Sequence, residues 1–206
     1  MISGKTLQHV AKLANLPMPL KPKNAKGWIG ELIEKSLGAT AGNLPEPDFQ
    51  HLGIELKTIP LNENNVPRES TYVCTVTLTG QETKWDASLV KRKLSRVLWV
   101  PVEAAPAIPF NQRRIGSAIL WSPSAEDEKI LMTDWEELME LVNMGHIADI
   151  NARYGRYLQI RPKAADARSL CKGVDDEGNL SLTLPRGFYL RTLFTRKILS
   201  SIGMDG

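Results

Sequence analysis

Two carboxylates and a lysine stand close together in the sequence, at Asp48, Glu55 and Lys57. Glu55 and Lys57 are two residues apart, so on a strand their side chains would point to the same side. Seven residues of fully extended chain would hold Asp48 roughly 23 Å from Glu55. The two carboxylates can therefore meet only if the chain folds back, and Leu52-Gly53 is a suitable place for that turn.

Converging carboxylates could hold a hard divalent cation, because Mg²⁺ prefers oxygen ligands and keeps several waters. Such an ion lowers the pKa of a bound water and stabilises charge on a phosphate group. Lys57 beside that water would orient the nucleophile and offset phosphate charge. The alternative is a solvent-exposed Glu–Lys ion pair on a strand, which the pattern alone leaves open.

Two further residues favour a phosphodiester-hydrolysing site. Glu34 lies on a predicted helix just before this segment and could supply a third carboxylate. Lys93 ends the basic cluster 91–93 and could bring a second ammonium group. Together with the basic character of most of the chain, these residues strengthen the nuclease hypothesis.

The elements that must position these side chains follow from hydrophobic periodicity and from turn residues. We expect helices over 6–15, 27–37, 86–93, 124–144 and 195–202, and strands over 54–59, 71–78, 96–102, 157–162 and 187–191. Gly38 is placed to cap the second helix. Residues 96–102 are almost continuously apolar, which predicts a central strand buried on both faces, and 71–78 is expected to pair beside 54–59. This order of strands and helices predicts an α/β or α+β domain around one central sheet.

The charge of the chain is unevenly distributed. The formal net charge is +3, but residues 122–149 carry −7, which leaves the rest of the chain at +10. The acidic block has helical spacing, so we expect an outward-facing helix. A basic body suits a polyanionic partner if that helix lies away from the binding face, although solvated faces of a mixed surface are the alternative.

The sequence lacks the motifs that are typical of several classes of enzyme and metal site. The chain has no phosphate-loop motif, no G-x-G-x-x-G after a strand and no G-x-S-x-G elbow, and its three histidines are widely spaced. No apolar run approaches the length of a membrane span, and the N-terminus lacks the apolar region of a signal peptide. Two cysteines fit a reducing compartment, so we expect a cytoplasmic protein without membrane association.

Seven blocks, in order from about residue 4 to residue 199, resemble the MutH family, the strand-nicking endonucleases of methyl-directed DNA mismatch repair. The blocks are KGWIGELIEKSLGATAG (26–42), DFQHLGIELKTIP (48–60), KLSRVLWVPVE (93–103), QRRIGSAILWSP (112–123), DWEELMELV (134–142), YLQIRPKAA (157–165) and TLPRGFYL (183–190). Several such blocks are far more specific than an acidic pair followed by a lysine.

The resemblance implies a restriction-endonuclease-like α/β fold with a central mixed sheet flanked by helices. It implies a single endonuclease domain over residues 1–206, with two lobes around a DNA-binding cleft. Asp48, Glu55 and Lys57 would form the catalytic motif. Asp48 and Glu55 would hold Mg²⁺, and Glu34 and Lys93 would be further members of the active site.

The same resemblance implies the substrate and the partners. The family nicks the unmethylated strand at hemimethylated GATC sites in double-stranded DNA, and MutL activates it together with MutS and ATP. We therefore expect a monomer with these partners. Arg161, Pro162 and Lys163 begin a loop similar to the family's major-groove reading loop.

Three further residues match positions near DNA in the family. Tyr189, together with Pro162, matches the residues that sense adenine methylation. Tyr72 stands where the family has an aromatic residue near DNA, and Lys26 resembles a phosphate contact. For the tyrosines, ordinary core packing is the alternative.

Two other functions stay open at this point. A GATC restriction endonuclease of the same fold would cut both strands, usually as a dimer. A non-catalytic DNA-binding or adaptor protein could have kept the fold, but clustered carboxylates near phosphates would weaken its binding unless a metal neutralised them.

Overall fold

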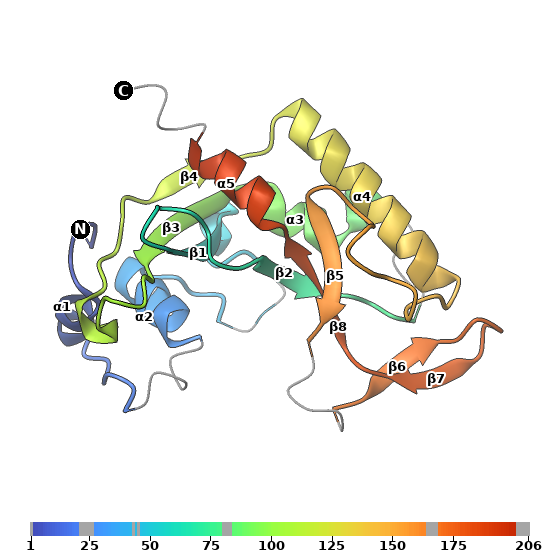
Figure 1. Ribbon diagram of the computed structural model, residues 1–206, viewed down its shortest axis with the longest axis horizontal. Coiled ribbons are helices and arrows are strands. Elements are labelled where there is room, and N and C mark those ends of the chain that lie inside the picture. The colour runs from blue at the N-terminus through green and yellow to red at the C-terminus, as the bar shows by residue number, and fades with distance from the viewer. Residues whose placement is uncertain are drawn as a thin grey trace. The chain divides into compact units, whose positions relative to one another are not determined.

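The computed structural model describes residues 2–20, 27–42, 44, 46–79, 84–163 and 169–200. The chain divides into two compact units and passes from one to the other four times. The first unit comprises Met1–Glu69, Arg96–Ser122 and Arg196–Gly206, and the second comprises Ser70–Ser95 and Pro123–Thr195. Figure 1 labels the elements in chain order. None of the described helices is long and apolar enough to span a membrane.

The first unit is built on a mixed three-stranded sheet in the order β1-β3-β4. β1 (Glu55–Leu61) runs parallel to β3 (Val97–Glu103), and β4 (Ile119–Trp121) runs antiparallel to β3. β3 is the middle strand, and four of its seven residues are buried. The structure therefore confirms the prediction of a buried central strand at 96–102.

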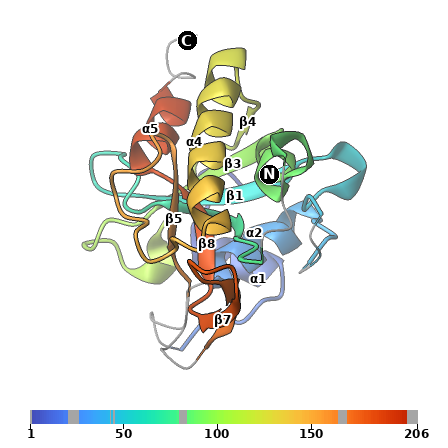
Figure 2. The same ribbon diagram turned by 90° about the vertical axis from the view of Figure 1, so that its right-hand side faces the viewer.

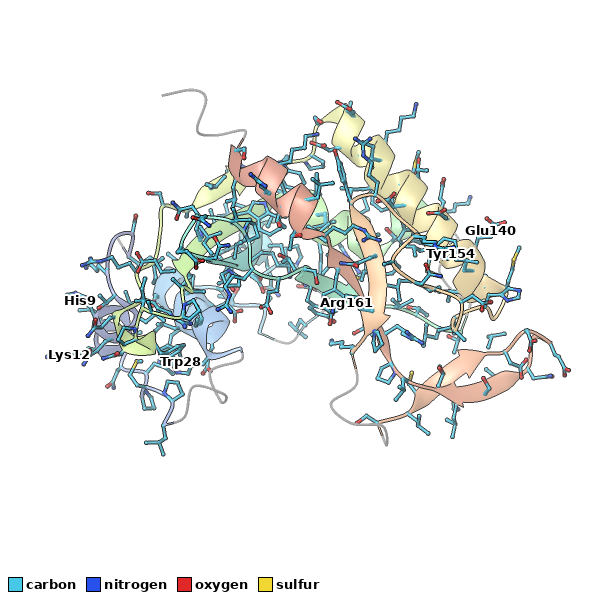
Figure 3. The ribbon with its side chains drawn as sticks, in the orientation of Figure 1. His9, Lys12, Trp28, Glu140, Tyr154 and Arg161 are labelled. Carbon is cyan, nitrogen blue, oxygen red and sulfur yellow. The ribbon has the colours of Figure 1, made fainter. Side chains whose placement is uncertain are left out.

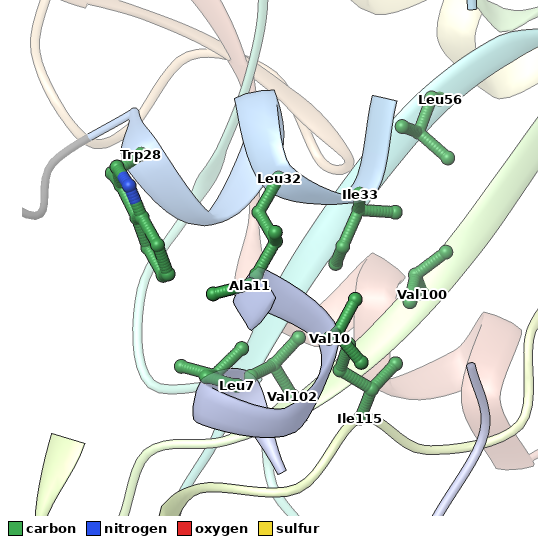
Figure 4. Packing of buried hydrophobic residues seen from close by; sticks show 10 residues of the cluster. All are labelled: Leu7, Val10, Ala11, Trp28, Leu32, Ile33, Leu56, Val100, Val102 and Ile115. Atoms are coloured by element: carbon green, nitrogen blue, oxygen red, sulfur yellow. The ribbon is translucent and has the colours of Figure 1, made fainter. Parts of the chain in front are cut away.

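Two helices pack against this sheet. In α1 (Leu7–Leu13), the Thr6 hydroxyl caps the first turn by accepting a hydrogen bond from the His9 N–H. α2 (Trp28–Leu37) ends at Gly38, whose left-handed conformation (φ 77°) confirms the predicted cap. Figure 4 shows the core they share with the strands, formed by Leu7, Val10, Ala11, Trp28, Leu32, Ile33, Leu56, Val100, Val102 and Ile115.

The second unit contains an antiparallel sheet in the order β2-β8-β5. Its strands are β2 (Thr71–Thr75), β5 (Leu158–Pro162) and β8 (Arg186–Leu190). Figure 2 shows β5 and β8 side by side. A separate hairpin joins β6 (Cys171–Val174) to β7 (Leu180–Thr183). The sequence pattern did not predict this hairpin.

Helices complete the second unit. α3 (Leu89–Leu94) begins after Ser88, whose hydroxyl accepts a hydrogen bond from the Lys91 N–H. α4 (Ala125–Asn143) packs against β5. α5 (Thr192–Ser200) starts three residues earlier than predicted, and the boundary between the two units falls within it, after Thr195. Short 3₁₀ turns occur at η2 (Gln50–Leu52), η3 (Trp85–Ala87) and η4 (Phe110–Gln112).

The prediction of one central sheet is wrong. The strands form two three-stranded sheets and a hairpin, and β2 pairs with β8 rather than beside β1. An alternating pattern shows that a segment is a strand but not which strand it pairs with, and β2 and β8 are separated by more than a hundred residues. The single domain over 1–206, with two lobes around a DNA cleft, stays a prediction.

The prediction that the acidic helix faces outward is only partly right. α4 is amphipathic and buries Leu131, Trp135 and Leu138, as expected. It also buries two of its own carboxylates, Asp127 and Asp134. Asp134 accepts three backbone hydrogen bonds, and this accounts for a buried charge that periodicity assigned to solvent.

Candidate active site and nucleic-acid interface

A tight turn brings Asp48 to the start of β1. The chain reverses through η2 and Gly53, which adopts a left-handed conformation with φ 62°. This turn lets one oxygen of the Asp48 carboxylate (Oδ2) accept a hydrogen bond from the Leu56 N–H at 2.7 Å. The predicted reversal at Leu52-Gly53 is confirmed.

The Asp48 backbone is held in place as well. Its carbonyl accepts hydrogen bonds from the N–H groups of Thr40 at 3.0 Å and Ala41 at 3.4 Å. These residues follow the Gly38 cap of α2. The segment after α2 is therefore tied to the residue that begins the acidic motif.

Glu55 and Lys57 form an ion pair on β1, in which Glu55 is buried and Lys57 is half-buried. The Lys57 ammonium lies 2.7 Å from Glu55 Oε1, and Glu55 is only 2% exposed. This geometry excludes the alternative of a solvent-exposed pair on a strand. Taking a carboxylate out of water is costly, so this pair is not by itself a source of stability.

Glu34 on α2 belongs to the same electrostatic neighbourhood. Burial raises the pKa of the Glu34 carboxyl above its ordinary value, and the negative charge of Asp48 raises it further. The ammonium of Lys57 lowers the same pKa, and the carboxylate of Glu55 raises it. The charges of Asp48, Glu55 and Lys57 thus all act on Glu34.

These carboxylates do not form a closed metal cage. Within the part of the chain that the structure describes, no group of three or more His, Cys, Asp or Glu side chains is placed to hold a metal ion. Mg²⁺ commonly binds through one or two carboxylates, with waters and substrate phosphates as its other ligands. The oxygen donors of Asp48 and Glu55 fit that mode.

The structure does not place two of the predicted residues relative to this cluster. Lys93 lies on α3 in the second unit, so its role at the active site stays a prediction. Lys26 lies outside the described residues, as does the loop beyond Lys163 as far as residue 168.

The second unit brings four of the predicted DNA-reading residues together on one face of the β2-β8-β5 sheet, namely Tyr72, Arg161, Lys163 and Tyr189. Tyr72 on β2 stands opposite Tyr189 on β8, and their rings meet edge to face with centroids 5.4 Å apart. The Arg161 guanidinium lies 5.7 Å from the Tyr189 ring centroid and donates a hydrogen bond to the Ser70 hydroxyl at 2.6 Å. Figure 3 labels Arg161.

Lys163 makes the corresponding contact with the other ring. Its ammonium lies 4.0 Å from the Tyr72 ring centroid and donates hydrogen bonds to the Tyr72 hydroxyl and, at 3.2 Å, to the Thr75 hydroxyl. Both tyrosines are half-buried rather than part of the core. The ordinary core-packing alternative is therefore wrong for both.

Pro162 ends β5 opposite Arg186 and is exposed. Ser70 and Thr75 were missed by the sequence analysis, because a serine or threonine near a strand end carries no signal of its own. Only the pairing of β2 with β8, and of β8 with β5, places their hydroxyls beside the two cations.

Comparisons with known proteins show the family of this chain. A family model described as "DNA mismatch repair enzyme MutH" matches residues 37–134. The DNA mismatch repair protein MutH of Shewanella baltica (strain OS155) is 49% identical over 203 residues, which cover 98% of this chain and 91% of the relative. The proteins of the same name from Pectobacterium atrosepticum and Serratia proteamaculans are 49% and 50% identical over 200 residues. Those 200 residues cover 97% of this chain and 87% and 88% of the two relatives.

A mixed α/β fold with a carboxylate and lysine cluster on a sheet strand is typical of restriction-endonuclease-like proteins. Identity of this extent over nearly the whole chain is decisive for the family. The chain belongs to the MutH family of DNA mismatch repair proteins.

Proposed function

We propose that this protein is a Mg²⁺-dependent endonuclease that nicks the unmethylated strand at hemimethylated GATC sites. The observation that carries the proposal is the first-unit cluster, in which the Asp48 carboxylate is fixed to β1 by the Leu56 N–H and the buried Glu55 is paired with Lys57. In a chain of the MutH family, such a cluster is best explained as a site for phosphodiester hydrolysis.

Each residue of the cluster has a separate role in the proposal. Asp48 and Glu55 would hold Mg²⁺, which supplies a more acidic bound water and charge stabilisation at the scissile phosphate. Lys57 would orient the attacking water, and its contact with Glu55 fixes the position of its ammonium group. Glu34 would add negative charge beside these residues, and Lys93 would add a second ammonium group.

The second unit would read the DNA sequence. A guanidinium such as that of Arg161 can donate two hydrogen bonds to guanine O6 and N7 in the major groove. A methyl group on adenine N6 adds bulk in that groove. Tyr189 and Pro162 would lie close to this adenine and would clash with the added methyl group. Tyr72, Lys163 and Lys26 would make further DNA contacts.

Activation by MutL, with MutS and ATP, belongs to the same proposal. So do action as a monomer in the cytoplasm and a DNA cleft between two lobes. A monomer that engages one site would cut one strand, whereas double-strand cleavage usually requires a dimer.

The test uses matched duplexes with one GATC site in the unmethylated, hemimethylated and fully methylated forms, with each strand carrying its own label. The protein is incubated with each duplex, with and without Mg²⁺, and with and without MutL and ATP. We expect Mg²⁺-dependent nicking of unmethylated strands only, with the fully methylated duplex left intact.

The same assay separates the alternatives. Cleavage of both strands in one event would point to a restriction endonuclease. Binding to GATC duplexes without cleavage, even with MutL and ATP present, would favour a non-catalytic DNA-binding protein. Either result would contradict the proposed function.

A further inference from the structure

Gly187 lies at the centre of the sheet face that carries the two tyrosines. It stands on β8, the middle strand, opposite Thr75 on β2 and opposite Arg161 on β5. Tyr189 is two residues further along the same strand and therefore points to the same face. Gly187 is thus surrounded by the residues that the proposed function assigns to DNA reading.

Glycine at this position is explained by space rather than by backbone conformation. Gly187 is not among the described glycines with positive φ, so alanine could adopt the same backbone. A Cβ atom at Gly187 would lie 2.9 Å from Tyr72 Cε2 and 3.1 Å from Tyr189 Cε2. Both rings lie over the bare backbone that glycine leaves.

The two rings cannot simply swing aside. Tyr72 is held at its hydroxyl and over its face by Lys163, and Tyr189 packs against Tyr72 and beneath Arg161. Any shift of the rings away from Gly187 therefore also displaces the two cations. Glycine in a strand interior lowers stability and usually marks a close approach, and here the close approach is made by the tyrosine rings.

We infer that Gly187 is a specificity-determining residue, which sets the height of the Tyr72 and Tyr189 rings above the sheet. This inference rests on the proposed function of the face in sensing adenine methylation. A side chain at Gly187 lifts both rings toward the bound DNA. The raised rings crowd the unmodified adenine as well as the methylated one, so the difference between the two substrates shrinks.

The test compares Gly187→Ala with Gly173→Ala as a matched control. Gly173 also lies in a strand without positive φ, and its Cβ would meet Thr183 Cγ2 at 2.8 Å in the β6–β7 hairpin. Affinities for unmethylated and fully methylated GATC duplexes are measured without Mg²⁺. We expect the affinity ratio to fall at least fivefold in Gly187→Ala and to change less than twofold in Gly173→Ala.

A second variant tests the physical cause. Tyr72→Ala removes the atom nearest to the new Cβ, so adding Gly187→Ala in that background should change affinity for the unmethylated duplex less than twofold. If Gly187→Ala alone fails to fold, the double variant should recover the fold. Additive effects of the two substitutions, or no recovery, would overturn the inference.

Ring NMR signals give a readout that does not depend on DNA. In Gly187→Ala, the signals of Tyr72 and Tyr189 should shift while those of Tyr154 and Tyr157 stay in place. Unshifted signals of the first pair would overturn the spacer role. Wild-type protein that binds both duplexes equally would contradict the proposed function, whereas wild-type discrimination that survives in Gly187→Ala would contradict this inference alone.

Discussion

At the scale of single residues, the candidate active site brings together charged side chains whose removal from water does not stabilise the fold. The buried Glu55 carboxylate is paired with the half-buried Lys57, and burial, together with the negative charge of Asp48, raises the pKa of the Glu34 carboxyl. Burial of like charges costs stability, and proteins retain such arrangements where they serve chemistry.

The first prediction concerns Lys57→Ala. We expect nicking to be lost at every Mg²⁺ concentration, because the metal cannot replace the ammonium that orients the water. The free energy of unfolding should also fall by about 1–3 kcal/mol, since the buried Glu55 carboxylate loses a charged hydrogen-bond partner. Lys12→Ala, at an exposed position on α1, is the control. Nicking by Lys57→Ala that recovers at high Mg²⁺ would disprove this role.

The second prediction concerns the pH dependence of stability in Glu34→Gln, measured by urea unfolding in a chelator. The pKa of Glu34 is raised in the folded protein, so the folded state holds this proton more tightly than the unfolded state does. Wild-type stability should therefore fall, relative to the variant, as pH rises from the unfolded pKa through the folded pKa. If the difference in unfolding free energy between wild type and Glu34→Gln stayed constant or reversed over that pH range, the pKa of Glu34 would not be raised in the folded protein.

At the scale of elements, α4 positions the strand that carries Arg161 and Pro162. The carboxylate of Asp134 accepts hydrogen bonds from the N–H groups of Arg156, Tyr157 and Leu158 at 2.6–2.8 Å, where β5 begins. These contacts fix the start of β5, while the residues proposed to read DNA lie at its other end.

The third prediction is that Asp134→Ala lowers the free energy of unfolding by about 3 kcal/mol, because buried backbone donors lose their acceptor. Glu136→Ala, two residues along on the exposed side of α4, should change it by less than about 0.5 kcal/mol. Urea denaturation measures both. Equal stabilities of the two variants would show that Asp134 does not anchor β5.

Local elements were the part of the fold that could be predicted from the sequence. The Gly38 cap and the turn at Gly53 follow from residue types whose backbone preferences are strong. The segment from Asp48 to Lys57, proposed to be catalytic, was predictable for the same reason, since it is local. Asp134 was misassigned because helical periodicity does not reveal that a carboxylate meets backbone donors from a distant strand.

At the scale of the whole molecule, strand pairing could not be predicted. β1 pairs with β3 and β2 pairs with β8, so neighbours in the sheets come from distant parts of the chain. The contacts of Ser70, Thr75 and Gly187 with the residues proposed to read DNA depend on that pairing. The family resemblance predicted that Arg161 and Tyr189 read DNA, but it did not predict which side chains hold these two residues in place.

The fourth prediction concerns the salt dependence of DNA binding. Residues 122–149 carry a net charge of −7, and the rest of the chain carries +10. Because of this excess of basic residues, the affinity for DNA should fall steeply as the salt concentration rises. Lys163→Ala should reduce the slope of log affinity against log salt by about 0.9 if its ammonium contacts one phosphate. Lys129→Ala, an exposed lysine on the acidic α4, should leave the slope unchanged. The same slope in both variants would exclude a phosphate contact for Lys163.

The central claim is that the first-unit cluster carries out phosphodiester cleavage, and Asp48→Asn tests it most directly. Asparagine keeps an oxygen that can accept the Leu56 N–H bond but removes the charge proposed to hold Mg²⁺. Single-turnover nicking of a hemimethylated GATC duplex is measured with MutL and ATP, and DNA affinity is measured without Mg²⁺. We predict nicking at least a hundredfold slower, with affinity within threefold of wild type. Nicking at the wild-type rate would contradict the account.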